Sequence, residues 1–286
     1  MSINDADAAT NPRVWLITGA SSGFGRAIAI AALDGGDIVV ATARRPQALD
    51  DLIAAYPTRA QAIALDVTNM NATQVIDGVI ARHGRIDVLV NNAGRTQVGA
   101  LEETTEQELR YLFELHFFGP AALTKAVLPH MRRQGVGAVV QMSSVGGQIT
   151  AAGFGAYCAT KFALEGLTET LSQEVDFGVR FLIVEPGAFR TGLFAAGSAY
   201  LSAAMPPYAA TVGPTREYVT SGDGTQPGDP AKAAAAILTA LAAERPPLRL
   251  PLGDDAVDAI RAHLAAVGDE VASWEAVARA TSFDPG

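Results

Sequence analysis

Short apolar runs alternate with longer stretches of helical periodicity along most of the chain. The runs predict strands at residues 14–18, 38–43, 60–65, 86–90, 136–142, 179–184 and 248–252. The longer stretches predict helices at residues 24–33, 46–55, 71–83, 105–131, 156–175 and 229–243. Apolar strands that alternate with helices form a parallel sheet covered on both faces. We therefore predict an α/β fold, a three-layer Rossmann-like doubly wound parallel sheet in a single domain, with its ligand crevice at the carboxyl ends of the strands.

One long segment and the two ends depart from this alternation. Residues 187–228 are rich in Gly and Pro and lack a clear period, which is typical of a functional lid. We predict a substrate lid at about 188–228. Residues 1–12 are small and polar, and we expect a flexible tail there, ahead of a single domain at 13–286. One or two amphipathic helices should close the chain.

Composition restricts the class of protein. The 286 residues are 49% apolar, which is enough for one substantial core. The formal net charge of −9 argues against nucleic acid as a partner. Cys158 is the single cysteine, so no intramolecular disulfide can form, which fits a cytoplasmic protein. We see neither a signal peptide nor an unbroken membrane span, and no Cys/His cluster with metal-ligand spacing, so we expect no membrane association and no metal.

A glycine-rich turn joins the first strand to the first helix. It is formed by Thr18–Gly25, with the spacing G-x3-G-x-G. Such a turn lets the backbone approach a pyrophosphate at the amino end of the helix, although on its own it can also be a merely tight turn. NAD-binding proteins usually carry an acidic residue at the end of the second strand, and here Arg44 and Arg45 occupy that place. Because a guanidinium pairs with a 2′-phosphate, we expect NADP(H), unless the two arginines are only solvated surface residues.

Tyr157 and Lys161 are four residues apart at the start of a predicted helix, so they share one helix face. An ammonium beside a phenol should lower the phenol pKa from its usual value near 10, which suits a general acid/base. Ser144 ends the fifth strand, where its hydroxyl could face the same crevice. A chance Tyr/Lys pair on a surface helix would show the same spacing.

Taken together, the motifs resemble the single-domain short-chain dehydrogenase/reductase family. The matching pieces, in the order of the family, are Thr18–Gly25, Asp66-Val67, Asn91–Gly94, Ser143-Ser144, Tyr157–Lys161 and Pro186-Gly187. The resemblance implies that Tyr157 is the catalytic acid/base, Lys161 its pKa modulator and ribose anchor, and Ser144 the hydroxyl that orients the substrate. It also implies, with the turn and the arginines, cofactor binding by Gly19, Ser21, Ser22, Gly23, Phe24, Gly25, Arg44, Arg45, Asp66, Val67, Asn92, Gly94, Tyr157, Lys161, Pro186, Gly187, Phe189 and Thr191.

The predicted helix at 105–131 carries one departure from the family. Thr105 and Glu108 form a capping box at its start, and Gly119-Pro120 should bend it. The family usually has an asparagine in this helix that holds a proton-relaying water, and His116 takes its place. Three alternatives are open: the helix distortion keeps the relay, the imidazole replaces it, or His116 only fills space. An imidazole in the path should add a titration near pH 6.5 to the rate profile.

We predict an NADP(H)-dependent ketoreductase or alcohol dehydrogenase that transfers a hydride between the nicotinamide and a small hydrophobic ketone or secondary alcohol. The alternatives are an NAD-dependent alcohol or steroid dehydrogenase and a non-catalytic NADP-binding redox sensor. The resemblance implies a homodimer or homotetramer that associates through the helices at 105–131 and 156–175. The residues expected to line an apolar substrate pocket are Phe154, Phe194, Tyr200, Leu201, Met205 and Tyr208.

Overall fold

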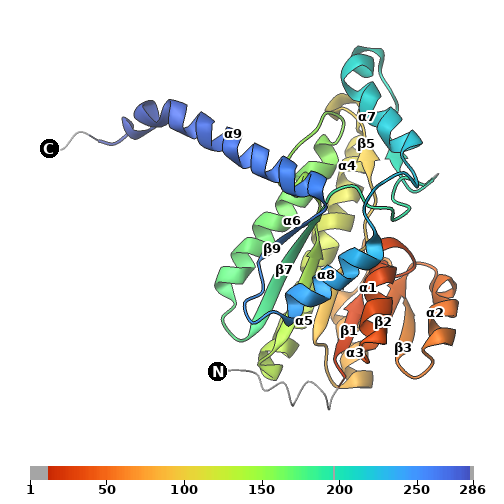
Figure 1. Cartoon of the computed structure of the whole chain (residues 1–286). Helices are drawn as coiled ribbons and strands as arrows, with labels where there is room; N and C mark the ends of the chain where they lie inside the picture. The colour runs from red at the N-terminus through yellow and green to blue at the C-terminus, as the bar shows by residue number, and fades with distance from the viewer. Residues whose placement is uncertain (1–11, 196, 284–286) are drawn as a thin grey trace.

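A seven-stranded parallel sheet forms the centre of the computed structural model, which describes residues 12–195 and 197–283 (Figure 1). Its strands are β1 (Val14–Ile17), β2 (Ile38–Ala43), β3 (Ala60–Ala64), β4 (Val88–Asn91), β6 (Gly137–Met142), β7 (Val179–Pro186) and β9 (Arg249–Leu252). Their order is β3-β2-β1-β4-β6-β7-β9, and every pair is parallel. The chain order reverses direction across the sheet between β1 and β4, which places a crevice at their carboxyl ends. The predicted flexible tail falls almost entirely outside the described residues.

Helices cover both faces of the sheet and complete the three predicted layers. One face is covered by α1 (Gly23–Asp34), α2 (Asp50–Ala55) and α8 (Pro230–Ala242), and the other by α3 (Ala72–His83), α5 (Gly119–Gln134) and α6 (Gly155–Glu174). The strands are apolar on both sides because each side meets a helical layer. In β1, Trp15 and Ile17 are buried in one core while Val14 and Leu16 are buried in the other.

The long helix predicted at 105–131 is divided by a π-helical turn. It begins as α4 (Glu106–Phe113), where the predicted capping box is present: Thr105 Oγ1 accepts from the Glu108 N–H at 3.2 Å. The π-helical turn Glu114–Phe118 follows, and α5 begins directly after it. The predicted bend at Gly119-Pro120 therefore takes the form of a π turn that ends at this pair, as expected where a proline removes a helix donor.

The segment predicted as a lid contains regular structure that its lack of a clear period did not indicate. It contains β8 (Tyr200–Leu201) and the helix α7 (Ala209–Ser221). β8 pairs with β5 (Gln97–Val98) in a second, two-stranded sheet. Arg216 of α7 forms a partly buried ion pair of 2.6 Å with Glu103 of the body. These contacts fasten the far half of the lid to the segment that follows β4.

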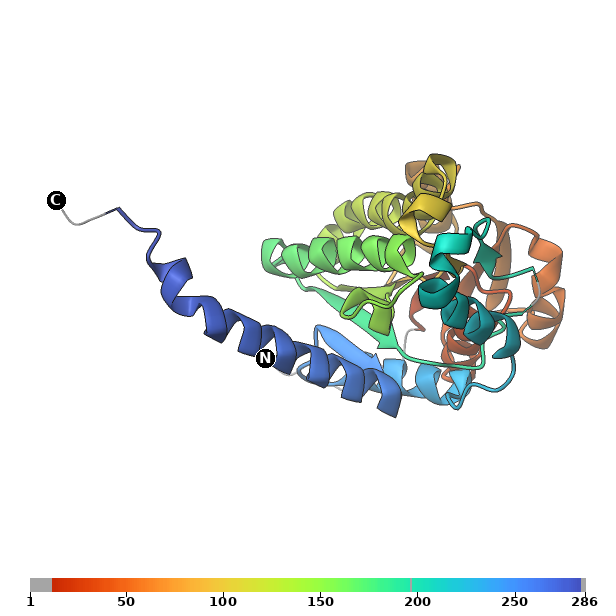
Figure 2. The ribbon, with the colours of Figure 1, turned by 90° about the horizontal axis from the view of Figure 1, so that it is seen from above.

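The last element of the chain is one long helix, and most of it does not pack on the sheet. α9 (Asp254–Arg279) projects away from the body in both ribbon views (Figures 1 and 2). Ala256 in its first turn is buried, whereas Leu264, Val271 and Trp274 farther along are each more than half exposed. No helix within the described residues combines the length and the hydropathy that a membrane span requires.

Candidate active site

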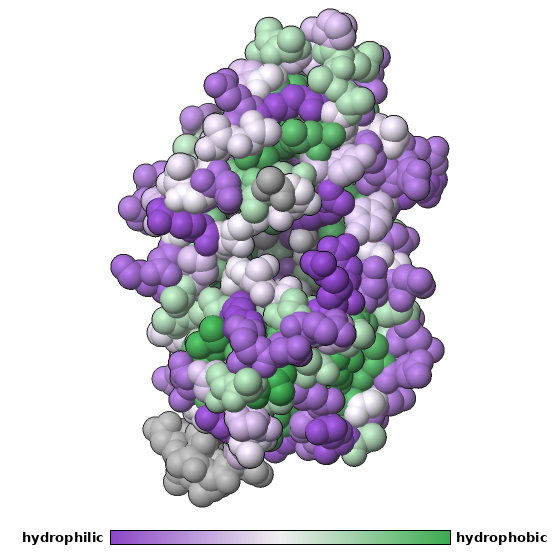
Figure 3. Space-filling model, turned by 90° about the vertical axis from the view of Figure 1, so that its right-hand side faces the viewer, coloured by the Kyte–Doolittle hydropathy of each residue, from purple (hydrophilic) through white to green (hydrophobic). Residues whose placement is uncertain are grey.

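A cavity of about 590 Å³ opens at the carboxyl ends of the strands, between the body and the start of the lid. In Figure 3 this side of the molecule is hollowed, and the residues around the hollow are near-neutral and hydrophilic, without a continuous hydrophobic patch. Most of the predicted site residues line the cavity: Gly19, Ser21, Ser22, Gly23, Phe24, Arg44, Arg45, Asp66, Val67, Asn92, Gly94, His116, Ser144, Tyr157, Lys161, Pro186, Gly187 and Thr191. Gly25 and Phe189 are not among the lining residues, and the Phe189 ring packs against Phe24 with centroids 5.1 Å apart.

The glycine turn is locked against the loop that follows β4. Gly19 has φ +65°, and a Cβ there would come within 2.9 Å of Ala93 Cα. A Cβ at Gly25 would overlap Asn92 Nδ2, which donates to the carbonyl oxygens of Thr18 (2.8 Å) and Gly19 (3.1 Å). The N-cap of α1 makes no side-chain hydrogen bond. The turn therefore presents the amino end of a helix, a favourable environment for a phosphate, to the cavity.

The ends of β2 and β3 form the opposite rim of this cofactor-sized cleft. Arg44 and Arg45 follow β2, are exposed and line the cavity, and neither takes part in an ion pair within the described residues. Asp66, just after β3, accepts hydrogen bonds from the N–H (3.0 Å) and hydroxyl (2.7 Å) of Thr68, which fix its carboxylate. This rim combines two unpaired cations with one oriented carboxylate.

Ser144 comes together with Tyr157 and Lys161 although they belong to different parts of the chain. Ser144 follows β6, and the other two lie in the first turns of α6. Lys161 Nζ donates to the carbonyl of Met142 at 2.8 Å and lies 5.6 Å from the centroid of the Tyr157 ring. Ser144 Oγ accepts from the Gly146 N–H at 3.0 Å and lowers the pKa of the neighbouring Tyr157 phenol. The fold therefore brings a hydroxyl, a phenol and an amine to one wall.

The predicted lowering of the phenol pKa is not what the protein groups alone produce. Burial raises the pKa of Tyr157 to about 12, and the hydrogen bond with Ser144 opposes this only in part. Burial also lowers the pKa of Lys161 to about 8, partly offset by the nearby Glu165 carboxylate. Both groups are removed from water, so the cost of charging them exceeds what their neighbours return. The phenol is held neutral, which is the form that donates a proton.

His116 is buried on the π-helical turn, and its imidazole is engaged at both nitrogens. Nε2 accepts from the backbone N–H of Arg95 at 3.2 Å, and Nδ1 lies 2.9 Å from Thr160 Oγ1. Because that hydroxyl donates its own proton to the carbonyl of Tyr157 (2.7 Å), Nδ1 must carry the proton of the Nδ1–Oγ1 bond. Burial, with the Lys161 and Arg95 charges, holds the pKa of His116 well below its usual 6.5. The ring is therefore neutral, in one fixed tautomer.

The substrate side of the cavity differs from the prediction. None of the expected apolar residues lines it: Phe154, Phe194, Tyr200, Leu201, Met205 and Tyr208. The folded lid is the reason, because Phe154, Phe194 and Tyr208 pack around Val98 and Val212 in a separate cluster. The wall instead includes residues that the sequence analysis missed: Arg95, Tyr111, Leu115, Leu193 and Ser198. The sequence offers one indication of Arg95, because this residue directly follows Gly94, which was predicted to line the cleft.

Comparison with known proteins gives consistent matches. The family model described as short chain dehydrogenase matches residues 13–200. An oxidoreductase of Botryotinia fuckeliana, BOA17, is 41% identical over 251 residues, which covers 86% of this chain and 90% of that protein. A short-chain dehydrogenase structure from Streptomyces avermitilis is 62% identical, with a TM-score of 0.90, and the match covers 96% of this chain and 99% of that one.

Two further solved structures are complexes with nicotinamide nucleotides. An alcohol dehydrogenase from Thermococcus sibiricus in complex with 5-hydroxy-NADP is 27% identical, with a TM-score of 0.70 over 85% of this chain and 96% of that one. A short-chain dehydrogenase/reductase from Burkholderia phymatum in complex with NAD is 25% identical, with a TM-score of 0.76 over 88% of this chain and 92% of that one. Similar structures thus bind either form of the nucleotide.

Proposed function

The chain belongs to the short chain dehydrogenase family, and on that premise we propose that it is an NADP(H)-dependent oxidoreductase for a small, mainly hydrophobic ketone or secondary alcohol. The observation that carries the proposal is that Ser144, Tyr157 and Lys161 line the same cavity as the glycine turn. NADPH, when bound, supplies the hydride. What remains for the protein is to hold the nucleotide, to orient the carbonyl and to deliver a proton.

The residues present fit a dinucleotide. The turn from Gly19 to Gly25 and the amino end of α1 would receive the pyrophosphate, because the backbone is open there and a Cβ at Gly25 has no room. Asp66 and Val67 would contact the adenine, and Asn92 and Gly94 would line the cleft. Thr191, which lines the cavity, would lie near the carboxamide of the nicotinamide, whereas Phe189 lies outside the lining and would support Phe24, against which its ring packs.

We favour NADP(H) over NAD(H) because of the charges at the end of β2. Arg44 and Arg45 are exposed on the cavity rim without carboxylate partners in the described part of the chain. A carboxylate at this place would repel a 2′-phosphate, whereas a guanidinium accepts it through charge-assisted hydrogen bonds. Ser22, on the facing turn, offers a hydroxyl to the same phosphate.

The proton comes from Tyr157 in the reducing direction. Ser144 and Tyr157 both hydrogen-bond the substrate carbonyl oxygen, and the neutral phenol donates its proton as the oxygen gains charge. Lys161 is held by the carbonyl of Met142 beside the phenol ring and stabilises the phenolate that remains. In the oxidising direction the same groups act in reverse.

We propose that His116 supports the proton path without carrying a proton itself. Its imidazole is neutral and bonded at both nitrogens. We propose that its backbone carbonyl is the functional part, since Pro120, four residues later, has no N–H with which to close the usual α-helical hydrogen bond to it. A water bound to this carbonyl would connect Lys161 with solvent. His116 is then a positioning residue that ties the π-helical turn to the loop after β4 and to α6.

We also propose association into a homodimer or homotetramer through α4, α5 and α6. Phe118, between α4 and α5, and Phe162 on α6 are 51% and 42% exposed in the single chain. Large aromatic side chains at this degree of exposure are typical of buried interface anchors. The projecting apolar residues of α9 provide additional surface for a second copy.

The proposal is tested by following NADPH oxidation with a panel of ketones for the parent protein and for Tyr157→Phe. Removal of the proton donor should lower turnover on the order of 10²- to 10⁴-fold while NADPH still binds. Turnover by the Phe variant at nearly the parent rate contradicts the mechanism. Tight NADPH binding without turnover of any ketone or alcohol would instead favour a redox sensor.

A further inference from the structure

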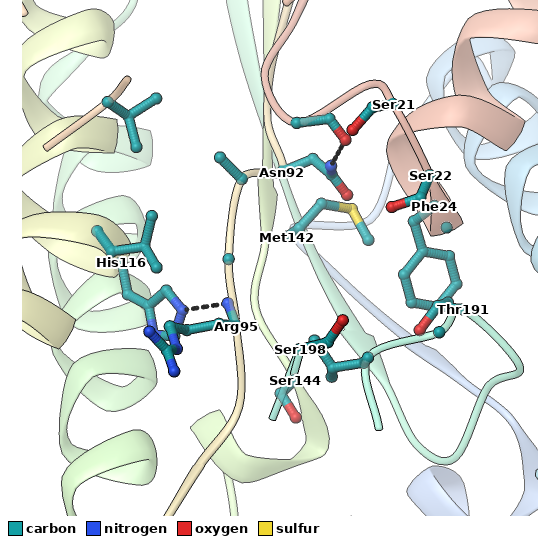
Figure 4. A pocket seen from close by; sticks show the side chains of 18 of the residues that line it. Ser21, Ser22, Phe24, Asn92, Arg95, His116, Met142, Ser144, Thr191 and Ser198 are labelled. Carbon is teal, nitrogen blue, oxygen red and sulfur yellow. Dashed lines mark hydrogen bonds between the residues drawn. The ribbon is translucent and has the colours of Figure 1, made fainter. Parts of the chain in front are cut away.

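We propose that Arg95 forms an anion-binding subsite and that the substrate is a ketone or secondary alcohol bearing a carboxylate. This inference rests on the proposed function and specifies its substrate class. Arg95 follows the end of β4 and lines the cavity together with Ser144, Tyr157 and Lys161. Figure 4 shows Arg95 and His116 on one side of the cavity, opposite Ser22, Phe24 and Thr191. Arg95 therefore lies away from the turn that would receive the pyrophosphate.

The charge of Arg95 has no ion-pair partner among the residues that the structure describes. No carboxylate of the described residues lies within ion-pair distance of its guanidinium. Its Nε is buried and makes no hydrogen bond. By contrast, Arg216 in the lid, which is similarly shielded from solvent, is paired with Glu103 at 2.6 Å. A partly buried guanidinium without a counter-ion is costly, and such a group on a cavity wall fits an external anion.

The distribution of unpaired arginines strengthens this interpretation. The protein carries a net charge of −9, yet one cavity is lined by three arginines that have no ion-pair partner in the described part of the chain. Arg44 and Arg45 lie at the end of β2, where a 2′-phosphate would bind. Arg95 lies after β4, beside the catalytic wall. Arg95 follows a different strand from Arg44 and Arg45 and lies away from the expected 2′-phosphate. We therefore assign Arg95 to a second anion, distinct from the phosphates of the nucleotide.

The guanidinium is held in place by two aromatic rings. Its central carbon lies 4.6 Å from the centroid of the Tyr200 ring and 5.9 Å from that of Tyr111. The Tyr200 hydroxyl in turn donates to Glu108 at 2.6 Å, and Ser202 donates to the second oxygen of that carboxylate at 3.0 Å. Glu108 is thereby occupied and does not pair with Arg95. A guanidinium stacked on rings keeps its edge free for two parallel hydrogen bonds to a carboxylate.

The inferred substrate has an apolar body that carries two polar groups, the carbonyl that reacts and a carboxylate. Its carbonyl meets Ser144 and Tyr157, and its carboxylate meets Arg95. Tyr111, Leu115 and Leu193 line the cavity and contact the body. No covalent step is added, because the carboxylate only fixes the orientation of the carbonyl relative to the hydride donor.

The test compares aryl ketones that carry a carboxylate with their neutral carboxamides, such as acetylbenzoate with acetylbenzamide, and longer homologues of both. The parent should favour the acid by roughly 10- to 150-fold in kcat/KM, the range for a charge-assisted contact. Arg95→Met should bring the ratio close to one, and Arg95→Lys should give an intermediate ratio. Arg110→Met removes a guanidinium that is 76% exposed on α4 and should leave the ratio at the parent value.

The outcomes separate this inference from the proposed function. An unchanged acid-to-amide ratio in Arg95→Met overturns the subsite, as does weaker NADPH binding with that ratio preserved, which would assign Arg95 to the nucleotide. If no ketone is reduced at all, the proposed function fails, and the anion-binding subsite is tested by ligand binding instead. Phenylacetate should then raise the unfolding temperature of the parent with NADPH more than phenylacetamide does. In Arg95→Met the two compounds should give equally small shifts. Equal shifts by both compounds in the parent refute the subsite.

Discussion

The variant His116→Asn tests whether His116 acts as a neutral positioning residue or carries a proton. The measurement is the pH dependence of the free energy of unfolding. In the folded protein both imidazole nitrogens are bonded, to the Arg95 N–H and to Thr160, and the pKa lies well below 6.5. In the unfolded chain the same imidazole titrates near 6.5. Folding therefore keeps neutral a group that the unfolded chain protonates in mild acid.

The direction in which stability changes with pH follows from the number of protons that the folded and the unfolded chain bind. Below pH 6.5 and above the folded pKa of His116, the unfolded chain binds one more proton than the folded protein. The free energy of unfolding then falls by about 1.4 kcal/mol for each pH unit of acidification, and this contribution is complete only above pH 6.5. Burial raises the pKa of Glu185 from 4.5 to about 8, which gives the opposite slope between those values. That second contribution is present in parent and variant alike and cancels in their difference.

We expect urea unfolding at several pH values from about pH 5 to pH 6 to show a pH slope that is more positive by about 1.4 kcal/mol per pH unit in the parent than in His116→Asn, and between about pH 7 and pH 8 the two slopes should be equal. The shorter side chain leaves one buried partner unbonded, which lowers stability at neutral pH by about 1–3 kcal/mol. His263→Asn on α9 controls for removing a histidine elsewhere. The rate profile of the parent should show no inflection near pH 6.5. Equal slopes below about pH 6, or an inflection that disappears in His116→Asn, would refute the reasoning.

Three other predictions concern the cofactor, the lid and the assembly. The parent should use NADPH more efficiently than NADH by roughly 10- to 150-fold in kcat/KM, and Arg44→Asp should remove that preference; equal efficiency in the parent contradicts the assignment. Hydrogen exchange at residues 189–195 should slow when NADP and a substrate analogue bind, because the cavity lies directly beneath them; an unchanged rate means a fixed surface loop. Light scattering should give the mass of a dimer or tetramer, and Phe162→Glu should shift it towards the monomer; a monomeric parent at micromolar concentration rules the interface out.

The central sheet could be predicted because its strands are apolar on both faces and need no distant partner to be recognised. The predicted bounds of β2 agree with the structure, and those of the other strands are close. The strands β5 and β8 could not be predicted, since each has two residues and exists only where the lid meets the body. α7 was missed because Pro214 lies inside it and its helical pattern is weak. It is supported by packing of Val212 and Val219 that only the fold reveals.

The candidate site likewise has a part that the sequence predicts and a part that it does not. The motif residues lie at strand ends and in the first turns of helices, and the alternation of elements alone brings them to one edge. The substrate wall depends on how the lid folds, so the expected Phe194 and Tyr208 face α7 instead of the cavity. The pKa of Tyr157 was also misjudged, because a sequence shows the neighbouring charge but not the extent of burial.

The attachment of the lid has a consequence for protein engineering. β8 pairs with β5, Tyr200 and Ser202 bind Glu108, and Arg216 binds Glu103, so lid and body share a small sheet and several polar contacts. A chimaera that receives only residues 189–228 from a relative would leave Glu103 buried without its guanidinium and β5 without its partner strand. Exchanging substrate range between members of the family therefore requires transplanting residues 95–108 together with the lid, as one module encoded by two separate stretches of the gene.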